Sequence, residues 1–163
     1  MGRLMAPSPR IYLDANFFIA MLEPADAALA AQLTRFYTLK GGGAETLMAT
    51  SELTLAELLV APYKNNDGDL IRTYETMFAS GGALETAAVD RNVLRQAARL
   101  RSRRPQIKLP DAIHLATAEY LACSHFLTFD LRISLAEADD PVQMKILAPT
   151  LESLGELIEE FVQ

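Results

Sequence analysis

The chain has 163 residues, half of them apolar, which suits a single domain spanning 1–163 and excludes disordered, collagen-like and fibrous classes. Its formal net charge of −6 argues against a protein that coats nucleic acid. No run approaches the ~18 apolar residues of a membrane span, and the start of the sequence lacks the apolar segment of a signal peptide. The lone cysteine, Cys123, cannot form an internal disulfide, so we expect a cytoplasmic protein that does not engage a membrane.

Apolar runs of strand length alternate with segments of helical periodicity along the whole chain. No hairpin signal appears between the strands. In chain order, the predicted elements are a strand at 10–13, helices after Asp14 and at 24–39, a strand at 46–50, helices at 52–61 and 69–80, a strand at 84–89, helices at 91–104 and 110–122, strands at 125–129 and 144–147, and a helix at 150–162. This alternation predicts an α/β fold, a three-layer α/β/α domain with a central parallel sheet.

Capping and breaking residues set the expected helix boundaries. Asn16 is a plausible cap of the first helix, and Pro24 opens the second. Ser51 is a good N-cap for a helix that stops before Pro62, because the residue before a proline avoids the helical region. Asp90 caps the helix that begins at residue 91.

Four acidic residues fall where a parallel sheet would bring them together. Asp14 and Asp130 each directly follow a strand-like run, and ligands bind outside the carboxyl ends of such strands. Asp111 begins a helix that starts at the same edge, and Glu57 lies about one and a half turns into the helix after Ser51. Each aspartate has a structural alternative as a helix cap or as a partner of the helix dipole. Glu57 is harder to explain in that way, because an unpaired carboxylate among leucines is costly to bury.

A cluster of carboxylates favours a metal site. Several carboxylates in one pocket raise each other's pKa values, and a divalent cation reverses that effect. The sequence has no histidine–cysteine cluster of the kind that binds zinc. Oxygen ligands suit Mg²⁺ or Mn²⁺, and such an ion can activate water for attack on a phosphodiester.

Basic residues are concentrated in one stretch of the acidic chain. Residues 91–108 hold seven of the 15 lysines and arginines and no acid. Such a stretch is a candidate phosphate-binding strip, with Arg95, Arg99 and Arg103 as its candidate RNA contacts. A solvated helix face explains the same residues equally well, so both interpretations stay open.

Four segments of the sequence resemble the acidic motifs of PIN domains, in the same order. They are IYLDANFFIA, TSELTLAELL, KLPDAIHLATA and HFLTFD, and the resemblance covers about 11–147. The sequence is most similar to VapC-type toxins, the ribonucleases of bacterial toxin–antitoxin pairs. The resemblance implies a Mg²⁺- or Mn²⁺-dependent endoribonuclease that hydrolyses RNA phosphodiester bonds, forms a homodimer and is held inactive by a small antitoxin.

The resemblance also implies roles for individual residues. Asp14, Glu57, Asp111 and Asp130 match the four acids that hold metal and position water in the family. Asn16 and Thr128 fall where the family often has small polar residues that line the pocket. The resemblance further implies that the first and fourth strands are adjacent at the centre of the sheet, which would place Asp14 and Asp130 on either side of the switch point.

Two other residue types near the motifs invite functional interpretations that we do not favour. His114 lies three residues after Asp111 on the same helix face, where a packed or hydrogen-bonded histidine is a better interpretation than a catalytic base. The phenylalanines beside the strands could stack on bases, but their positions favour packing in the core. They are Phe17, Phe18, Phe126 and Phe129.

Two alternative functions remain at this point. One is a catalytically inactive PIN-fold module that mediates protein interactions, which the presence of all four acids disfavours. The other is a phosphoaspartyl phosphatase or receiver-type domain, in which a strand-end aspartate is the nucleophile. The phosphatase type requires an acid or threonine two residues after that aspartate, and Asn16 stands there instead. Neither type explains Glu57.

Overall fold

A computed structural model describes residues 9–39, 47–130, 133 and 144–162 of the chain. Within these described residues, five strands form one sheet, and every pair of neighbouring strands is parallel. The strands are β1 (Ile11–Leu13), β2 (Met48–Ser51), β3 (Leu84–Ala87), β4 (His125–Leu127) and β5 (Lys145–Leu147). The helices are α1 (Ala15–Leu22), α2 (Ala27–Tyr37), α3 (Glu52–Asn65), α4 (Gly68–Met77), α5 (Arg91–Arg103), α6 (Leu109–Tyr120) and α8 (Leu151–Val162).

The order of the strands confirms the predicted centre of the sheet. The order is β3-β2-β1-β4-β5, so β1 and β4 are neighbours and the direction of winding reverses between them. Tyr12 pairs with Phe126 in the register of these two strands. The carboxyl ends of β1 and β4 therefore lie side by side, and the residues that follow them meet at one edge.

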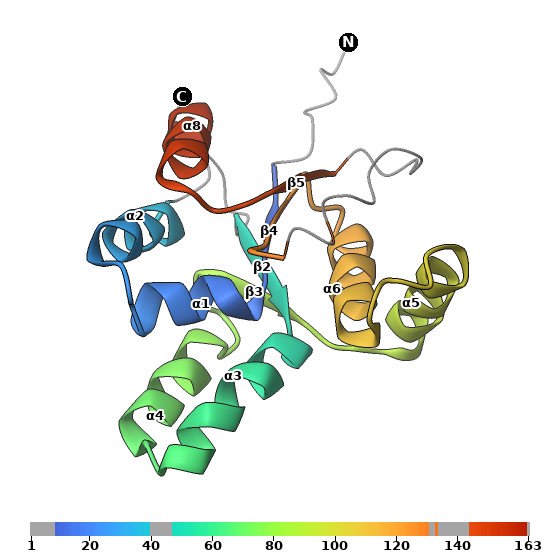
Figure 1. Cartoon of the computed structure of the whole chain (residues 1–163), viewed down its shortest axis with the longest axis horizontal. Coiled ribbons are helices and arrows are strands. Elements are labelled where there is room, and N and C mark those ends of the chain that lie inside the picture. Colours follow the sequence, from blue (N-terminus) through green and yellow to red (C-terminus); the bar gives the residue numbers. More distant parts are fainter. Residues whose placement is uncertain (1–8, 40–46, 131–132, 134–143, 163) are drawn as a thin grey trace.

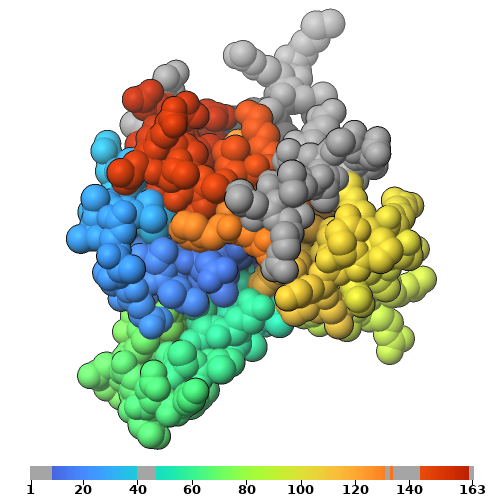
Figure 2. All heavy atoms as spheres, in the orientation of Figure 1, coloured from blue at the N-terminus to red at the C-terminus, as the bar shows by residue number. Residues whose placement is uncertain are grey.

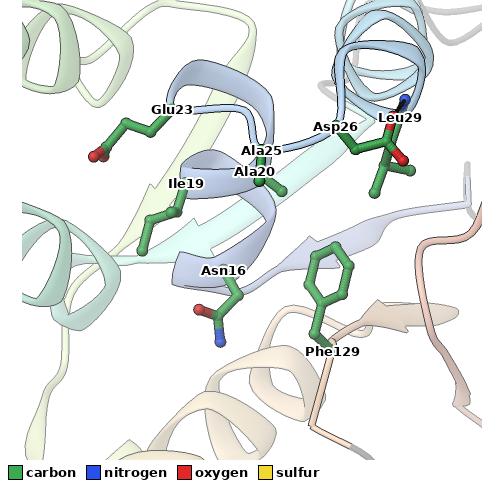
Figure 3. A pocket seen from close by; sticks show the side chains of 8 residues that line it. All are labelled: Asn16, Ile19, Ala20, Glu23, Ala25, Asp26, Leu29 and Phe129. Atoms are coloured by element: carbon green, nitrogen blue, oxygen red, sulfur yellow. Dashed lines mark hydrogen bonds between the residues drawn. The ribbon is translucent and has the colours of Figure 1, made fainter.

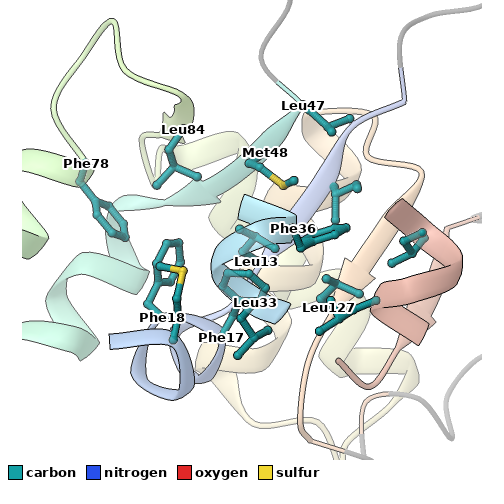
Figure 4. Packing of buried hydrophobic residues seen from close by; sticks show 14 of the residues in the cluster. Leu13, Phe17, Phe18, Leu33, Phe36, Leu47, Met48, Phe78, Leu84 and Leu127 are labelled. Atoms are coloured by element: carbon teal, nitrogen blue, oxygen red, sulfur yellow. The ribbon is translucent and has the colours of Figure 1, made fainter. Parts of the chain in front are cut away.

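Side chains alternate between two cores, one on each face of the sheet. Ile11 and Leu13 point to a core formed with α1, α2, α3, α4 and α8, part of which Figure 4 shows. Tyr12 points to the other core, which α5 and α6 cover. Figure 1 shows these two groups of helices on opposite sides of the strands. This confirms the predicted three-layer α/β/α architecture with a central parallel sheet.

The helix α3 is longer than the sequence predicted. It continues through Pro62 and ends at Asn65, followed by the C-cap residue Asn66, whose backbone is left-handed with φ of 55°. Proline removes one backbone hydrogen bond within a helix, but Pro62 is buried and α3 packs against α4, so tertiary contacts offset the loss. Figure 2 shows this helical pair, in green, projecting from the body of the molecule.

The predicted starts of two further helices were also wrong. The second helix begins at Ala27 rather than at Pro24, because the Asp26 side chain accepts the backbone N–H groups of Ala28 and Leu29. The cap of the first helix is Asp14, and Asn16 lies inside that helix. None of the helices in the described ranges is long and apolar enough to cross a membrane.

Candidate active site

A small polar cavity of about 80 Å³ lies at the carboxyl ends of β1 and β4. All four predicted acids line it, and so do the two predicted pocket-lining residues. The full lining of this acidic cavity is Asp14, Ala15, Asn16, Glu57, Asp111, His114, Phe126, Thr128, Asp130 and Ile133. The acids come from four separate segments of the chain: the start of α1, the middle of α3, the start of α6 and the end of β4. The fold thus brings together residues more than a hundred positions apart in the sequence.

Asp14 is the most buried acid of the cavity, with 7% of its surface exposed. Its Oδ1 accepts the backbone N–H of Phe17 at 3.2 Å, so the carboxylate caps α1 and faces the cavity as well. Burial raises the pKa of Asp14, and the nearby charge of Glu57 adds to the rise, while hydrogen bonds from the Thr128 hydroxyl and Phe17 oppose it. The folded protein therefore disfavours a negative charge here unless a cation is close.

Thr128 connects two of the acids. Its hydroxyl donates to Asp14, and the same oxygen accepts the backbone N–H of Asp130 at 3.0 Å. Thr128 is buried, with 2% of its surface exposed. A threonine that supplies one donor and one acceptor in this way fixes the ends of β1 and β4 relative to each other.

Glu57 reaches the cavity from α3, and 35% of its side chain is exposed. Its Oε2 is 2.9 Å from Nε2 of His114, which is itself buried. The expectation that Glu57 lies on a largely buried stretch is only partly correct, because Ala56 beside it is exposed. The expected hydrogen-bonded histidine at position 114 is confirmed.

Asp111 and Asp130 complete the acidic lining. Asp111 lies in the first turn of α6, after Lys108 as the N-cap residue, where the helix dipole favours a negative charge. Asp130 follows β4, and both carboxylates are partly exposed. Asp111 can therefore interact with the dipole of α6 and still face the cavity as a possible ligand.

The donors of the cavity fit Mg²⁺ or Mn²⁺ better than other common ions. They are mainly oxygens, from the four carboxylates, the Thr128 hydroxyl and the Asn16 amide, with the His114 ring beside Glu57. Burial raises the pKa of Asp14, and a bound cation would offset that cost. Over the described ranges, no three His, Cys, Asp or Glu side chains stand close enough to form a ready-made metal group. Mg²⁺ commonly takes one or two protein carboxylates and keeps several waters.

A second, larger pocket of about 380 Å³ adjoins the acidic cavity, and Asn16 lines both. This apolar pocket is lined by Asn16, Ile19, Ala20, Glu23, Ala25, Asp26, Leu29 and Phe129 (Figure 3). Phe129 is 38% exposed and Ile19 39%, so the expectation of core packing for Phe129 was wrong. The other three phenylalanines for which we expected core packing, Phe17, Phe18 and Phe126, are fully buried. Phe129 differs because it lies two residues beyond Leu127, the last residue of β4, and so is outside the sheet.

The helix α5 carries most of the basic stretch on its outer side. Val93, Ala97 and Leu100 are buried against the rest of the protein. Arg95, Arg99 and Arg103 are exposed, and we call these three residues the basic face of α5. Neighbouring Arg101 is used structurally, because its Nε donates to the carbonyl of Ile107 at 3.1 Å. The geometry is compatible with a phosphate-binding strip and with a solvated helix face.

Sequence reasoning missed two features of the site. One is Tyr12, whose hydroxyl is 2.8 Å from Nδ1 of His114 in the layer behind the acidic cavity. Alternation along β1 predicts that Tyr12 faces away from Leu13, but only the β1–α6 packing reveals its partner. The other is the apolar pocket, which forms between α1, α2 and the end of β4 and has no local signal in the sequence.

Comparisons with known proteins agree with this geometry. The sequence profile described as "PIN domain" matches residues 11–139. No curated protein sequence matches the chain. A chain of a toxin–antitoxin complex from Klebsiella pneumoniae has the same fold, with a TM-score of 0.61 and 21% identity, over 86% of this chain and 98% of that chain.

Two structures from Mycobacterium tuberculosis are also similar. VapC20, described as a toxin that cleaves the sarcin–ricin loop, has a TM-score of 0.62 and 18% identity, over 78% of this chain and 95% of that chain. A chain of VapBC-5, of the VapBC family of toxin–antitoxin systems, has a TM-score of 0.55 and 25% identity, over 87% of this chain and 99% of that chain. These matches span nearly the full length of each toxin-system chain.

Proposed function

Because the chain belongs to the PIN domain family, we propose that it is a Mg²⁺- or Mn²⁺-dependent endoribonuclease and the toxin of a VapBC-type toxin–antitoxin pair. The observation that carries this proposal is the acidic cavity. Four carboxylates from four distant segments line one cavity at the switch point of a parallel sheet, where ligands of such sheets bind. Chains with this fold occur in solved toxin–antitoxin complexes.

We propose that the four carboxylates hold the ion and orient the substrate phosphate. Hydrogen bonds from Phe17, Thr128 and His114 fix the carboxylates of Asp14 and Glu57. Asp111 and Asp130 are partly exposed, so they suit contacts with ordered water and the ion's hydration shell. When bound, Mg²⁺ or Mn²⁺ would stabilise negative charge on the phosphodiester and lower the pKa of water for attack at phosphorus.

The substrate we propose is single-stranded RNA, with Arg95, Arg99 and Arg103 as its phosphate contacts. These side chains are exposed on α5, which packs along α6, the helix that supplies Asp111. Basic residues outside an acidic cavity would attract the RNA backbone, which the carboxylates alone would repel. The choice of RNA over DNA rests on the family resemblance.

The phosphoaspartyl alternative is disfavoured by the burial of Asp14. A nucleophilic aspartate must reach a phosphoryl donor, but Asp14 is 7% exposed and its Oδ1 is engaged by Phe17. Asn16, the residue two positions later, lies in α1. The inactive-module alternative predicts the same fold without cleavage, so only an activity measurement separates it from the proposal.

For the antitoxin, we propose the apolar pocket as a docking site. Its apolar lining includes the partly exposed Ile19 and Phe129. It also has two carboxylates: Glu23, whose Oε1 accepts from the Tyr74 hydroxyl at 2.7 Å, and Asp26, which caps α2. Carboxylates repel an RNA backbone and attract lysine or arginine, so the pocket suits an apolar segment of a basic protein partner. An occupant would sit beside Asn16, which also lines the acidic cavity, and would hinder access of RNA. A homodimer belongs to the same proposal by resemblance, and a cytoplasmic location by the single cysteine of the sequence.

The chemistry of the cut tests the proposed reaction. Hydrolysis by water and a divalent ion does not use the RNA 2′-hydroxyl as nucleophile, so the fragments should carry a 5′ phosphate and a 3′ hydroxyl. Enzymes that use a pair of histidines leave a cyclic phosphate and a 5′ hydroxyl. The two histidines of this chain lie on separate elements, with His114 paired to Glu57 and His125 beside Ser124.

The measurement is end-labelling of fragments from a single-stranded RNA digested with Mg²⁺, and again with EDTA. We expect 5′-phosphate ends with Mg²⁺ and no cleavage with EDTA. Cyclic-phosphate ends, or cleavage that persists in EDTA, would contradict the proposed mechanism. An absence of cleavage under both conditions, across several RNAs, would favour the inactive module.

A further inference from the structure

A chain of two hydrogen bonds lies directly behind Glu57. The Tyr12 hydroxyl is 2.8 Å from Nδ1 of His114, and Nε2 of His114 is 2.9 Å from Oε2 of Glu57. The three residues come from β1, α6 and α3, so the chain joins the sheet to both helices. Tyr12 is fully buried and His114 is 4% exposed.

The Tyr12 hydroxyl sets the direction of both bonds. A tyrosine hydroxyl carries its proton at neutral pH and can donate it to a ring nitrogen. When Nδ1 of a neutral His114 accepts from Tyr12, the ring hydrogen is on Nε2, which then donates to the Glu57 carboxylate. Tyr12 thereby selects the tautomer that Glu57 needs.

Packing holds this chain in one arrangement. The ring of Tyr12 stacks on Phe126 with centroids 4.9 Å apart, and it meets the His114 ring edge-on at 5.9 Å. Both ring nitrogens of His114 are engaged by side chains from two other elements, as a buried polar ring requires. Here one of those partners, Glu57, lines the acidic cavity.

We propose that Tyr12 and His114 are positioning residues that fix the Glu57 carboxylate for cation binding. This inference rests on the proposed function, because it assigns Glu57 to the metal. A carboxylate whose orientation is already set loses less conformational entropy when a cation binds. Hydrogen bonds to a ligating carboxylate from outside the coordination shell commonly contribute strongly to metal affinity.

Two substitutions at one position separate the two hydrogen bonds. His114→Gln places an amide near the position of Nε2 and keeps a donor for Glu57. His114→Asn places its amide near Nδ1, which keeps a partner for Tyr12 but leaves Glu57 without its donor. We expect His114→Asn to weaken Mn²⁺ binding roughly ten-fold, and His114→Gln to bind Mn²⁺ nearly as the unsubstituted protein does. Mn²⁺ affinity is measured without RNA, by electron paramagnetic resonance of the free ion.

Tyr12→Phe gives an independent measurement, because it keeps the stacked ring and removes only the hydroxyl. We expect its Mn²⁺ affinity to fall, by less than that of His114→Asn, because the histidine is then free to adopt the other tautomer. This variant decides the question if His114→Asn does not fold. The matched control is His125→Asn, because His125 is also a buried histidine but does not line the acidic cavity. This variant should bind Mn²⁺ normally.

The outcomes distinguish this inference from the proposed function. Asp14→Asn should abolish Mn²⁺ binding, and if it does not, or if the unsubstituted protein binds no Mn²⁺, the proposed metal site itself is wrong. If Asp14→Asn abolishes binding while His114→Asn and Tyr12→Phe bind normally, the positioning role is overturned and the site stands. A purely structural role for His114 would lower the metal-free melting temperature of the Asn and Gln variants alike and leave their Mn²⁺ affinities equal.

Discussion

The acidic cavity and the basic face of α5 are charged regions that arise in opposite ways. The cavity draws its acids from four segments between Asp14 and Asp130, and only the fold brings them together. The three arginines of the basic face lie within one helix, where a spacing of four residues places side chains on the same side. A helix produces such a face from local sequence alone, so convergence from distant segments is the stronger indication of function.

The two regions also differ in electrostatic cost. The cavity raises the pKa of Asp14 through burial and through the charge of Glu57, so the metal-free protein holds an unfavourable arrangement there. The arginines of the basic face are exposed to solvent, which screens their mutual repulsion. An arrangement that costs stability without its ligand is typical of a functional site. Substitutions in the cavity should therefore have larger effects than those on α5.

The largest expected effect is the loss of cleavage when a cavity acid is neutralised. We expect Asp111→Asn to lower the single-turnover rate of RNA cleavage in Mg²⁺ by at least about 100-fold, the upper end of the loss seen for residues that only support metal ligands. Expression of the unsubstituted protein should slow cell growth, and expression of Asp111→Asn should not.

The matched control for this substitution is Asp69→Asn. Asp69 also lies in the first turn of a helix, α4, but it is exposed and pairs with Arg72 away from the cavity. Its cleavage rate should stay within a few-fold of normal. If Asp111→Asn cleaved as fast as this control, the cavity would have no part in the reaction.

A smaller effect is expected when the basic face of α5 is neutralised. Changing Arg95, Arg99 and Arg103 together to Gln should weaken RNA binding and flatten its salt dependence. Each lost phosphate contact removes about 0.7 from the slope of log K against log salt for single strands, so three contacts amount to about 2. Binding is measured by fluorescence anisotropy in the non-cleaving Asp111→Asn background.

The control for α5 is a triple substitution elsewhere with the same change in net charge. Arg35, Lys64 and Arg72 are exposed on α2, α3 and α4, and changing them to Gln should leave the slope nearly as steep as before. Equal slopes for the two triple variants would mean that the basic face is a solvated helix surface that does not bind RNA.

The sequence was most informative where one local rule determines the structure. Strand-length apolar runs predicted β1, β2 and β4 to within two residues of where they lie. Asp90 caps α5 as expected, through bonds to the backbone of Asn92 and Val93. The positions of the acids after strands and at helix starts sufficed to predict that all four would meet.

Predictions failed where tertiary contacts decide the structure. Proline would end an isolated helix, but α3 continues through Pro62 because α4 packs against it. The Tyr12–His114–Glu57 chain joins residues up to 102 positions apart, and no local pattern marks those partners. Phe126 and Phe129 belong to the same apolar run of the sequence, which gives no reason to treat them differently. Phe126 is buried within β4, whereas Phe129 is exposed because β4 ends before it.

The smallest expected effect concerns the stability of the metal-free protein, and it follows from the raised pKa of Asp14. A raised carboxyl pKa gives a contribution to stability that is complete below the unfolded value of about 3.9 and is lost as pH rises through the folded value. Asp14→Asn keeps the helix cap without the charge. In the absence of metal at neutral pH, it should therefore melt higher than the unsubstituted protein, by about 2–4 °C per kcal/mol of relief.

Scanning calorimetry of metal-free protein over a range of pH measures this difference. It should shrink as pH falls toward the unfolded pKa, because a protonated Asp14 and an asparagine are both neutral. Added Mg²⁺ should reverse the order at neutral pH, since an ion that binds only the folded state stabilises the protein that can hold it. Asp26→Asn is the control, because Asp26 caps α2 through similar bonds but is exposed. A pH dependence of equal size in both variants would mean that Asp14 carries no special electrostatic cost, and the contrast between the cavity and the basic face would then rest on geometry alone.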